Sequence, residues 1–99
     1  MDFGISQRSL ELLRLALRRF PEIKNLRVFG SRAMGNYKNG SDIDLAIMDP
    51  VDGETAQRFS TLVNEELPIP YRVDIVVYDR LENQALKDHI REKGLPFEL

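Results

Sequence analysis

Two aspartates separated by one residue, in the segment SDIDLAI at residues 41–47, are the strongest chemical feature of the sequence. Because side chains alternate between the two faces of a strand, Asp42 and Asp44 would share one face, and the apolar residues between and after them would share the other. Two neighbouring carboxylates repel each other unless a cation lies between them, and Mg²⁺ prefers oxygen ligands. The spacing therefore predicts a magnesium site on this strand.

A third carboxylate, Asp74, lies at the centre of the strand expected over residues 71–78. If this strand pairs with the first in matching register, the three carboxylates converge. Such a set could hold two metal ions about 3.5–4 Å apart, the arrangement used in two-metal phosphoryl and nucleotidyl transfer. The competing interpretation is that all three are solvated carboxylates on an outer face of the sheet.

The segment FGSRAMG at residues 29–35 indicates a turn that could hold phosphates. Gly30 lets the backbone approach a phosphate closely, and the Ser31 hydroxyl with nearby N–H groups can donate to a triphosphate. Arg32 is a candidate phosphate partner, with a solvent-facing turn arginine as the alternative. Ser41 either begins the strand through a local side-chain hydrogen bond or supports the metal ligands without binding the metal itself. A Walker A loop is excluded because its Gly-Lys-Ser/Thr sequence is absent.

The elements that must position these residues follow from hydrophobic periodicity and from Pro and Gly punctuation. Helices are expected at residues 6–20, 52–67 and 82–93, and strands at residues 26–29, 43–48 and 71–78. A loop at residues 31–41 would begin with a helical turn, and residues 95–99 would form a short edge strand or a loose end. This order predicts an α/β fold in which a small sheet is backed by helices on one face.

Composition limits the classes of function. A chain of 99 residues predicts a single domain over residues 1–99, and its net charge of −2 argues against nucleic acid as a partner. There is no cysteine, and no stretch has the roughly 20 apolar residues that a membrane span needs. A cytoplasmic protein without membrane contact is therefore expected. The one histidine, His89, is expected to be partly buried or at the surface rather than a catalytic base, because no Ser/His/Asp arrangement surrounds it.

These motifs together resemble a known signature. Gly30-Ser31, then SDID at residues 41–44, then the VDI strand at residues 73–75, is similar to the pattern of the DNA polymerase β-type nucleotidyltransferase superfamily. The fuller string GSRAMGNYKNGSDIDLAI resembles the minimal nucleotidyltransferases, the MntA-like antitoxins paired with HEPN-domain toxins. One departure is Met34, where many members have a basic residue. The resemblance implies a polymerase β-like fold with a small mixed sheet.

The resemblance also implies roles for individual residues. Asp42 and Asp44 would bind both of two Mg²⁺ ions, and Asp74 would complete the site and help activate the acceptor hydroxyl. Gly30 and Ser31 would hold the β- and γ-phosphates. The implied reaction moves AMP from the substrate ATP to a tyrosine hydroxyl of the HEPN toxin, releasing pyrophosphate and silencing the toxin's ribonuclease. A hetero-oligomer of the two proteins is expected.

Two other functions stay open at this point. The chain could be a non-catalytic antitoxin that blocks its toxin by binding alone. It could also be a nucleotidyltransferase that acts on a small molecule or an RNA end. Relatives of that kind generally carry a further domain that holds the acceptor, and 99 residues leave little room for one.

Overall fold

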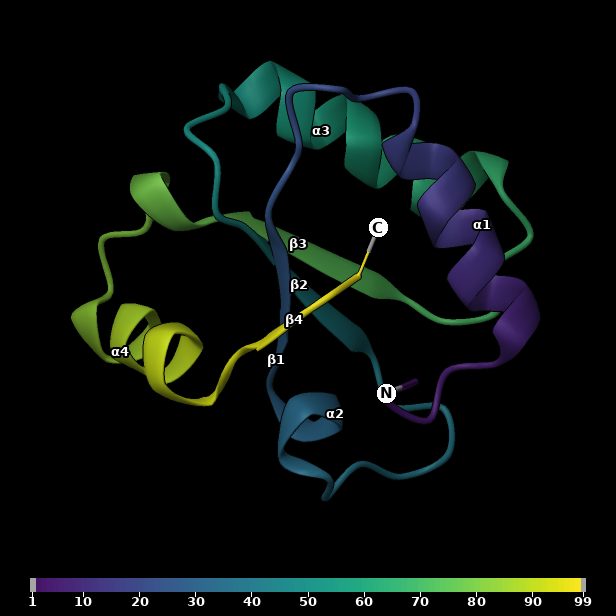
Figure 1. The fold of residues 1–99 in the computed structure, drawn as a ribbon, viewed down its shortest axis with the longest axis horizontal. Helices are drawn as coiled ribbons and strands as arrows, with labels where there is room; N and C mark the ends of the chain where they lie inside the picture. The colour runs from purple at the N-terminus through teal and green to yellow at the C-terminus, as the bar shows by residue number, and fades with distance from the viewer. Residues whose placement is uncertain (1, 99) are drawn as a thin grey trace.

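A four-stranded mixed sheet in the order β3-β2-β1-β4 organises the computed structural model, which describes residues 2–98 (Figure 1). Its strands are β1 (Leu26–Phe29), β2 (Ile43–Ile47), β3 (Val73–Val77) and β4 (Leu95–Pro96). β2 runs parallel to β3 and antiparallel to β1, and β4 adds to the free edge of β1 in the antiparallel sense. The expected α/β fold with a small mixed sheet is confirmed.

Three of the helices begin where a polar side chain caps them. The helices are α1 (Gln7–Leu17), α2 (Ser31–Met34), α3 (Gly53–Thr61) and α4 (Gln84–Lys93), with a π-helical turn at Leu62–Glu66 and a 3-10 turn at Tyr78–Arg80. The side chains of Ser6, Asp52 and Asn83 each accept a hydrogen bond from a backbone N–H three residues on. All three expected helices are therefore present, with ends that differ by a few residues.

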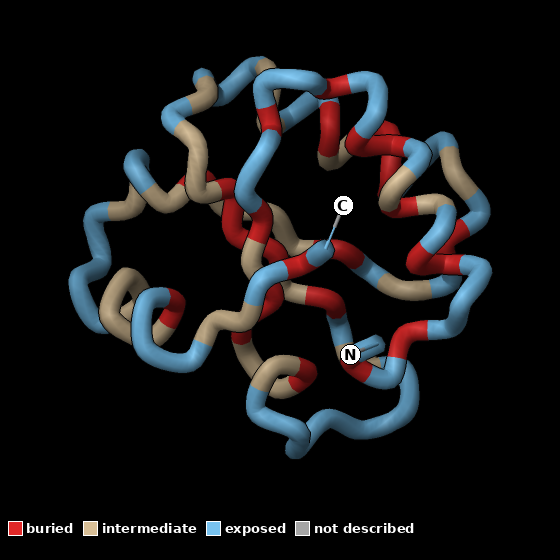
Figure 2. The backbone as a smooth tube through the Cα atoms, in the orientation of Figure 1, coloured by how far each residue is buried: buried red, intermediate tan, exposed pale blue. Residues whose placement is uncertain are grey.

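The main core lies between the sheet and the helices α1 and α3. Leu13 of α1 and Phe59 of α3 are fully buried against the sheet residues Val28 and Leu45. Figure 2 shows the buried positions gathered along the central strands and along the inner sides of these two helices. Burial of such side chains contributes roughly 1.5–3 kcal/mol each, so this layer fixes the sheet on which the aspartates stand.

Helix α4 covers the opposite face of the sheet, so the expectation that helices lie on one face only is wrong. Phe29, Ala46 and Ile90 form a second, smaller cluster of buried residues there. The reason is the alternation along β2, because Ala46 follows Asp44 on the same face and is completely buried. One face of β2 therefore carries a carboxylate at its start and an apolar contact with α4 further along.

The strand that carries Asp74 is at one edge of the sheet, and a side chain secures its start. The Asn64 amide, from the π-helical turn, donates to the Val73 carbonyl at 2.9 Å and accepts from the Val73 N–H at 2.8 Å. This pair replaces the backbone partners that a neighbouring strand would supply. Asn64 therefore holds the chain directly before Asp74.

Among residues 2–98, no helix is long and apolar enough to cross a membrane.

Candidate active site

The sheet register brings two of the three aspartates side by side. Asp44 of β2 is the direct partner of Asp74 in the parallel strand β3. Neighbouring strands of a sheet lie only about 4.7–4.9 Å apart. Asp42 lies one residue before β2 and is exposed. The matching register, which was the condition for the carboxylates to converge, is thus present.

The electrostatics of Asp44 reflect this crowding. Burial raises the pKa of Asp44 above its ordinary value, and the carboxylates of Asp74 and Asp42 raise it further. The His89 imidazole acts in the opposite direction when it carries a positive charge. A carboxylate in such surroundings is easier to keep charged when a cation is bound beside it.

The third carboxylate is turned toward a different partner. Asp74 Oδ1 pairs with Arg72 Nε at 3.0 Å, and the two side chains are 41% and 74% exposed. Within residues 2–98, no group of three acidic or histidine side chains is assembled closely enough to hold a metal ion. The expected three-carboxylate cluster is therefore not formed in this arrangement. An exposed ion pair of this kind is worth no more than about 1 kcal/mol, so Asp74 can exchange it for a cation at little cost.

The donor set nevertheless fits Mg²⁺. The ion takes carboxylate oxygens and retains several water molecules, and it needs only one or two protein carboxylates beside the phosphates of a substrate. Asp44 and Asp74 are paired in register, and Asp42 lies two residues before Asp44, so the site offers at least that many carboxylates. A bound cation would favour the charged form of Asp44 and so offset the burial and the neighbouring carboxylates that raise its pKa.

Gly30, at the end of β1, is the residue that admits the Asp44 carboxylate. Its φ of 71° and ψ of −153° fall in a region that is essentially restricted to glycine. A Cβ atom at this position would collide with the carboxylate of Asp44. The glycine expected to approach a phosphate therefore has a second, observed role, because it leaves room for the central aspartate.

Arg32 lies inside the structure, where the sequence led us to expect either a phosphate partner or a solvent-facing residue. The residue is 3% exposed, and its guanidinium donates to the Ser41 carbonyl at 3.0 and 2.8 Å and to the Phe3 carbonyl at 3.0 Å. It also lies over the rings of Tyr37 and Tyr71, about 5 Å from each centroid. Burial rules out the solvent-facing alternative, and this placement does not favour a phosphate contact. What the contacts do is fix the chain directly before Asp42.

Ser41 makes a local side-chain hydrogen bond, the first of the two roles expected for it. Its hydroxyl accepts from the Lys38 N–H at 2.9 Å and closes the turn before β2. Ser31 begins α2, the single helical turn expected at the start of this loop. The backbone bond from the Met34 N–H to the Gly30 carbonyl, at 3.1 Å, connects that turn to Gly30.

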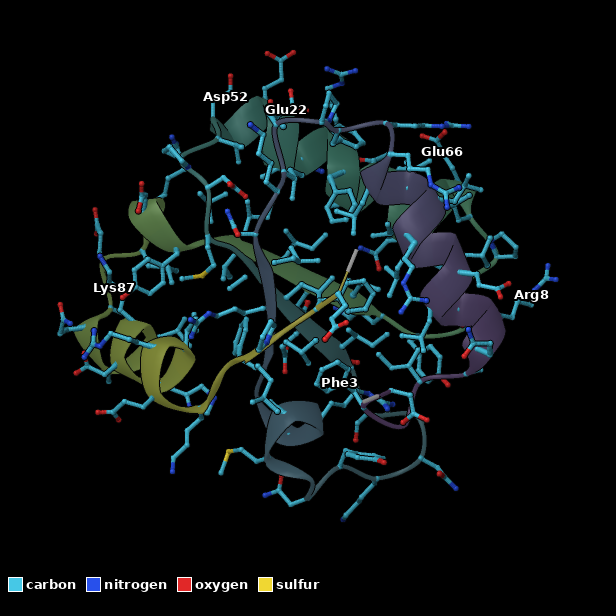
Figure 3. All side chains as sticks on the ribbon, viewed as in Figure 1. Phe3, Arg8, Glu22, Asp52, Glu66 and Lys87 are labelled. Atoms are coloured by element: carbon cyan, nitrogen blue, oxygen red, sulfur yellow. The ribbon has the colours of Figure 1, made fainter. Side chains whose placement is uncertain are left out.

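We expect the substitution Arg32→Lys to lower the free energy of unfolding by roughly 2–4 kcal/mol, because an ammonium cannot reproduce a planar fork of donors to buried carbonyls. Urea unfolding measures this change. Arg8→Lys is the matched control, because Arg8 is exposed and points outward from α1 (Figure 3), and it should change stability by less than about 0.5 kcal/mol. Equal stability of the two variants would contradict the role assigned to Arg32.

His89 is the residue whose place the sequence did not indicate. It is partly buried, as expected, but its Nε2 accepts a hydrogen bond from the Gly30 N–H at 3.1 Å. Its ring stands edge to face with Phe29 at 6.1 Å. No local signal could have shown this contact, because the two partners are 59 residues apart in the chain.

Comparisons with known proteins agree with this fold. Residues 10–96 match the family model described as nucleotidyltransferase domain. The fold is similar to a chain of a toxin–antitoxin complex with AMP-PNP (20% identity, TM-score 0.71, 90% of this chain and 72% of the other). It is also similar to a chain of an MntA–HepT complex (18% identity, TM-score 0.67, 94% of this chain and 72% of the other). A third similar chain comes from the complex of the tri-AMPylated Shewanella oneidensis HEPN toxin with MNT antitoxin (18% identity, TM-score 0.66, 93% of this chain and 71% of the other). A search of curated proteins finds no match.

Proposed function

Because the chain belongs to the nucleotidyltransferase domain family, we propose that it transfers AMP from ATP to a hydroxyl of a HEPN toxin and so acts as its antitoxin. The acceptor that we propose is a tyrosine. The observation that carries the proposal is the direct pairing of Asp44 with Asp74, beside a glycine whose missing side chain makes room for Asp44. The similar fold of the AMPylated toxin–antitoxin complex supports the choice of acceptor.

We propose that Asp42 and Asp44 hold two Mg²⁺ ions and that Asp74 shares one of them. Bound there, the ions would neutralise charge on the phosphates and lower the pKa of an acceptor hydroxyl. Ser31 would contact the β- and γ-phosphates at the end of β1. The carboxylate of Asp74 would accept the proton of the acceptor hydroxyl. The acceptor oxygen would bond to the α-phosphorus while the bond from that phosphorus to the bridging oxygen breaks, and pyrophosphate would leave with the electron pair.

The order of the strands supports an approach of the nucleotide and of the acceptor from opposite sides of β2. Gly30 and Ser31 lie at the end of β1, and Asp74 lies on β3, on the other side of β2. An open hollow of about 650 Å³ lies beside β3 and is lined by Asp74, Arg72 and Asn64, among others. An acceptor that enters along this hollow would approach from the side opposite the departing pyrophosphate. That is the arrangement which in-line displacement requires.

The test is transfer of label. The purified protein is incubated with Mg²⁺ and ATP labelled at the α-phosphate, in lysate of its host and, separately, with a purified HEPN partner. We expect a labelled protein band with the wild type and none with the variant Asp42→Asn/Asp44→Asn. A toxin that is neutralised without label, equally well by both proteins, would instead establish an antitoxin that acts by binding alone. Label recovered only in a small molecule would establish the small-molecule alternative.

A further inference from the structure

Helix α4 reaches the candidate site through the side chain of His89. His89 lies one residue before Ile90, which is fully buried in the contact between α4 and the sheet. That contact fixes the helix, and the ring of His89 then stands against Phe29, the last residue of β1. From this position its Nε2 accepts the Gly30 N–H at 3.1 Å. The contact joins the far end of the chain to the turn between β1 and α2.

That turn has few other means of holding its shape. Glycine loses more conformational freedom on folding than any other residue, and Gly30 occupies a region that other residues avoid. The helix that follows has four residues, too few to be stable alone. Arg32 anchors the second residue of that helix to the Ser41 and Phe3 carbonyls. The Met34 N–H holds the Gly30 carbonyl, and the His89 ring holds the Gly30 N–H, which belongs to the peptide group between Phe29 and Gly30.

We propose that His89 is a positioning residue for nucleotidyl transfer, which holds the Gly30 peptide so that Ser31 and Asp44 keep their relative places. The inference rests on the proposed function. The hydrogen bond uses the Gly30 N–H, so this amide is not a phosphate donor, and the phosphate contact falls to Ser31 and the groups after it. Because Nε2 accepts, the proton of the neutral imidazole is on Nδ1.

Two substitutions separate the hydrogen bond from the packing of the ring. In His89→Gln the side-chain oxygen can accept near the place of Nε2, whereas His89→Leu retains similar apolar volume without an acceptor. Binding of α,β-methylene-ATP with Mg²⁺, measured by calorimetry, reports on the turn without any transfer. We expect His89→Leu to raise the Kd about tenfold and His89→Gln to restore most of the loss. We also expect the KM for ATP to rise more than kcat falls.

Amide exchange and the imidazole tautomer test the same contact without reference to nucleotide. The Gly30 amide should exchange slowly with solvent in the wild type and in His89→Gln, and quickly in His89→Leu. Nitrogen-15 spectra of the wild type should show the proton on Nδ1. Equal weakening by both substitutions, unchanged nucleotide binding in His89→Leu, or a proton on Nε2 would each overturn the proposal.

These readouts distinguish the two levels of inference. A wild type that binds no nucleotide, yet protects the Gly30 amide through His89, would contradict the proposed function and leave only a structural hydrogen bond, which also overturns the positioning role. A wild type that binds nucleotide and does not depend on the His89 acceptor would overturn the positioning role alone. Thermal melts of each variant verify that it is folded under the conditions of the assay.

Discussion

Replacing Gly30 with alanine is expected to lower the rate of nucleotidyl transfer about 100-fold, because the new Cβ would displace the central carboxylate of the site. The collision is with Asp44, which the register places between its neighbours on β1 and β3. Either the carboxylate moves away from Asp74, or the backbone leaves its observed φ and ψ. Both responses change the geometry on which in-line transfer depends. The backbone strain alone costs about 1–3 kcal/mol of stability.

Gly35→Ala is the matched control for this prediction. Gly35 also has a positive φ, 82°, but a Cβ atom there meets nothing within 4 Å. The left-handed conformation costs an alanine about 1–2 kcal/mol, so the two variants should lose similar stability. Only Gly30→Ala should lose transfer, measured as initial rate at saturating ATP in folded protein. Comparable rates for the two variants would show that Asp44 does not need the space that Gly30 leaves.

Local sequence patterns were sufficient to place the residues that carry the proposed chemistry on the correct faces of their strands. The alternation in residues 41–47 put Asp42 and Asp44 on one face, and the structure agrees because the intervening residues are buried in the main core. The same alternation put Asp74 opposite the apolar face of β3. Their pairing could not be read from the pattern. A shift of β3 by one residue would have turned Asp74 into the core, so the register was predictable only on the condition that the strands were neighbours.

Interactions between distant segments were beyond local reasoning. Helix α4 has an amphipathic pattern that suits either face of the sheet, and the buried residues that it packs against, Phe29 and Ala46, lie in other elements. The partners of Arg32 are backbone carbonyls up to 29 residues away, and a carbonyl leaves no mark in a sequence. For the same reason the acceptor role of His89 toward a backbone N–H was hidden. The pairing of the Asp74 carboxylate with Arg72, rather than with a cation shared with the other aspartates, depends on side-chain rotamers, which the spacing does not encode.

Replacing Asp44 with asparagine is expected to have the largest effect on activity, at least roughly a 1,000-fold loss of transfer. Asp44 is the middle carboxylate, paired with Asp74 and two residues from Asp42. An amide of the same shape leaves the packing of β2 in place but removes the charge that a divalent cation needs. The loss should persist at high Mg²⁺ concentration, since the ligand itself has changed. Transfer restored by excess Mg²⁺ would mean that Asp44 is not a principal ligand.

The same substitution should make the metal-free protein more stable. Burial and the carboxylates of Asp74 and Asp42 raise the pKa of Asp44, so its charged form is disfavoured in the folded state. The stability that this group contributes is present below its ordinary pKa, is lost as the pH rises through the raised pKa, and is missing at neutral pH. Asp44→Asn should therefore raise the free energy of unfolding at neutral pH without metal.

Urea unfolding in the presence of a chelator measures that difference, which should shrink as the pH is lowered toward the ordinary pKa of a carboxylic acid. Mg²⁺ should then reverse the order of the two proteins, because a ligand that binds only the folded state stabilises the wild type and has lost its site in the variant. A variant that is less stable than the wild type at neutral pH, with or without Mg²⁺, would contradict the crowding of carboxylates at Asp44. A more stable but inactive variant would show that the fold tolerates this repulsion at the position where the cation is required.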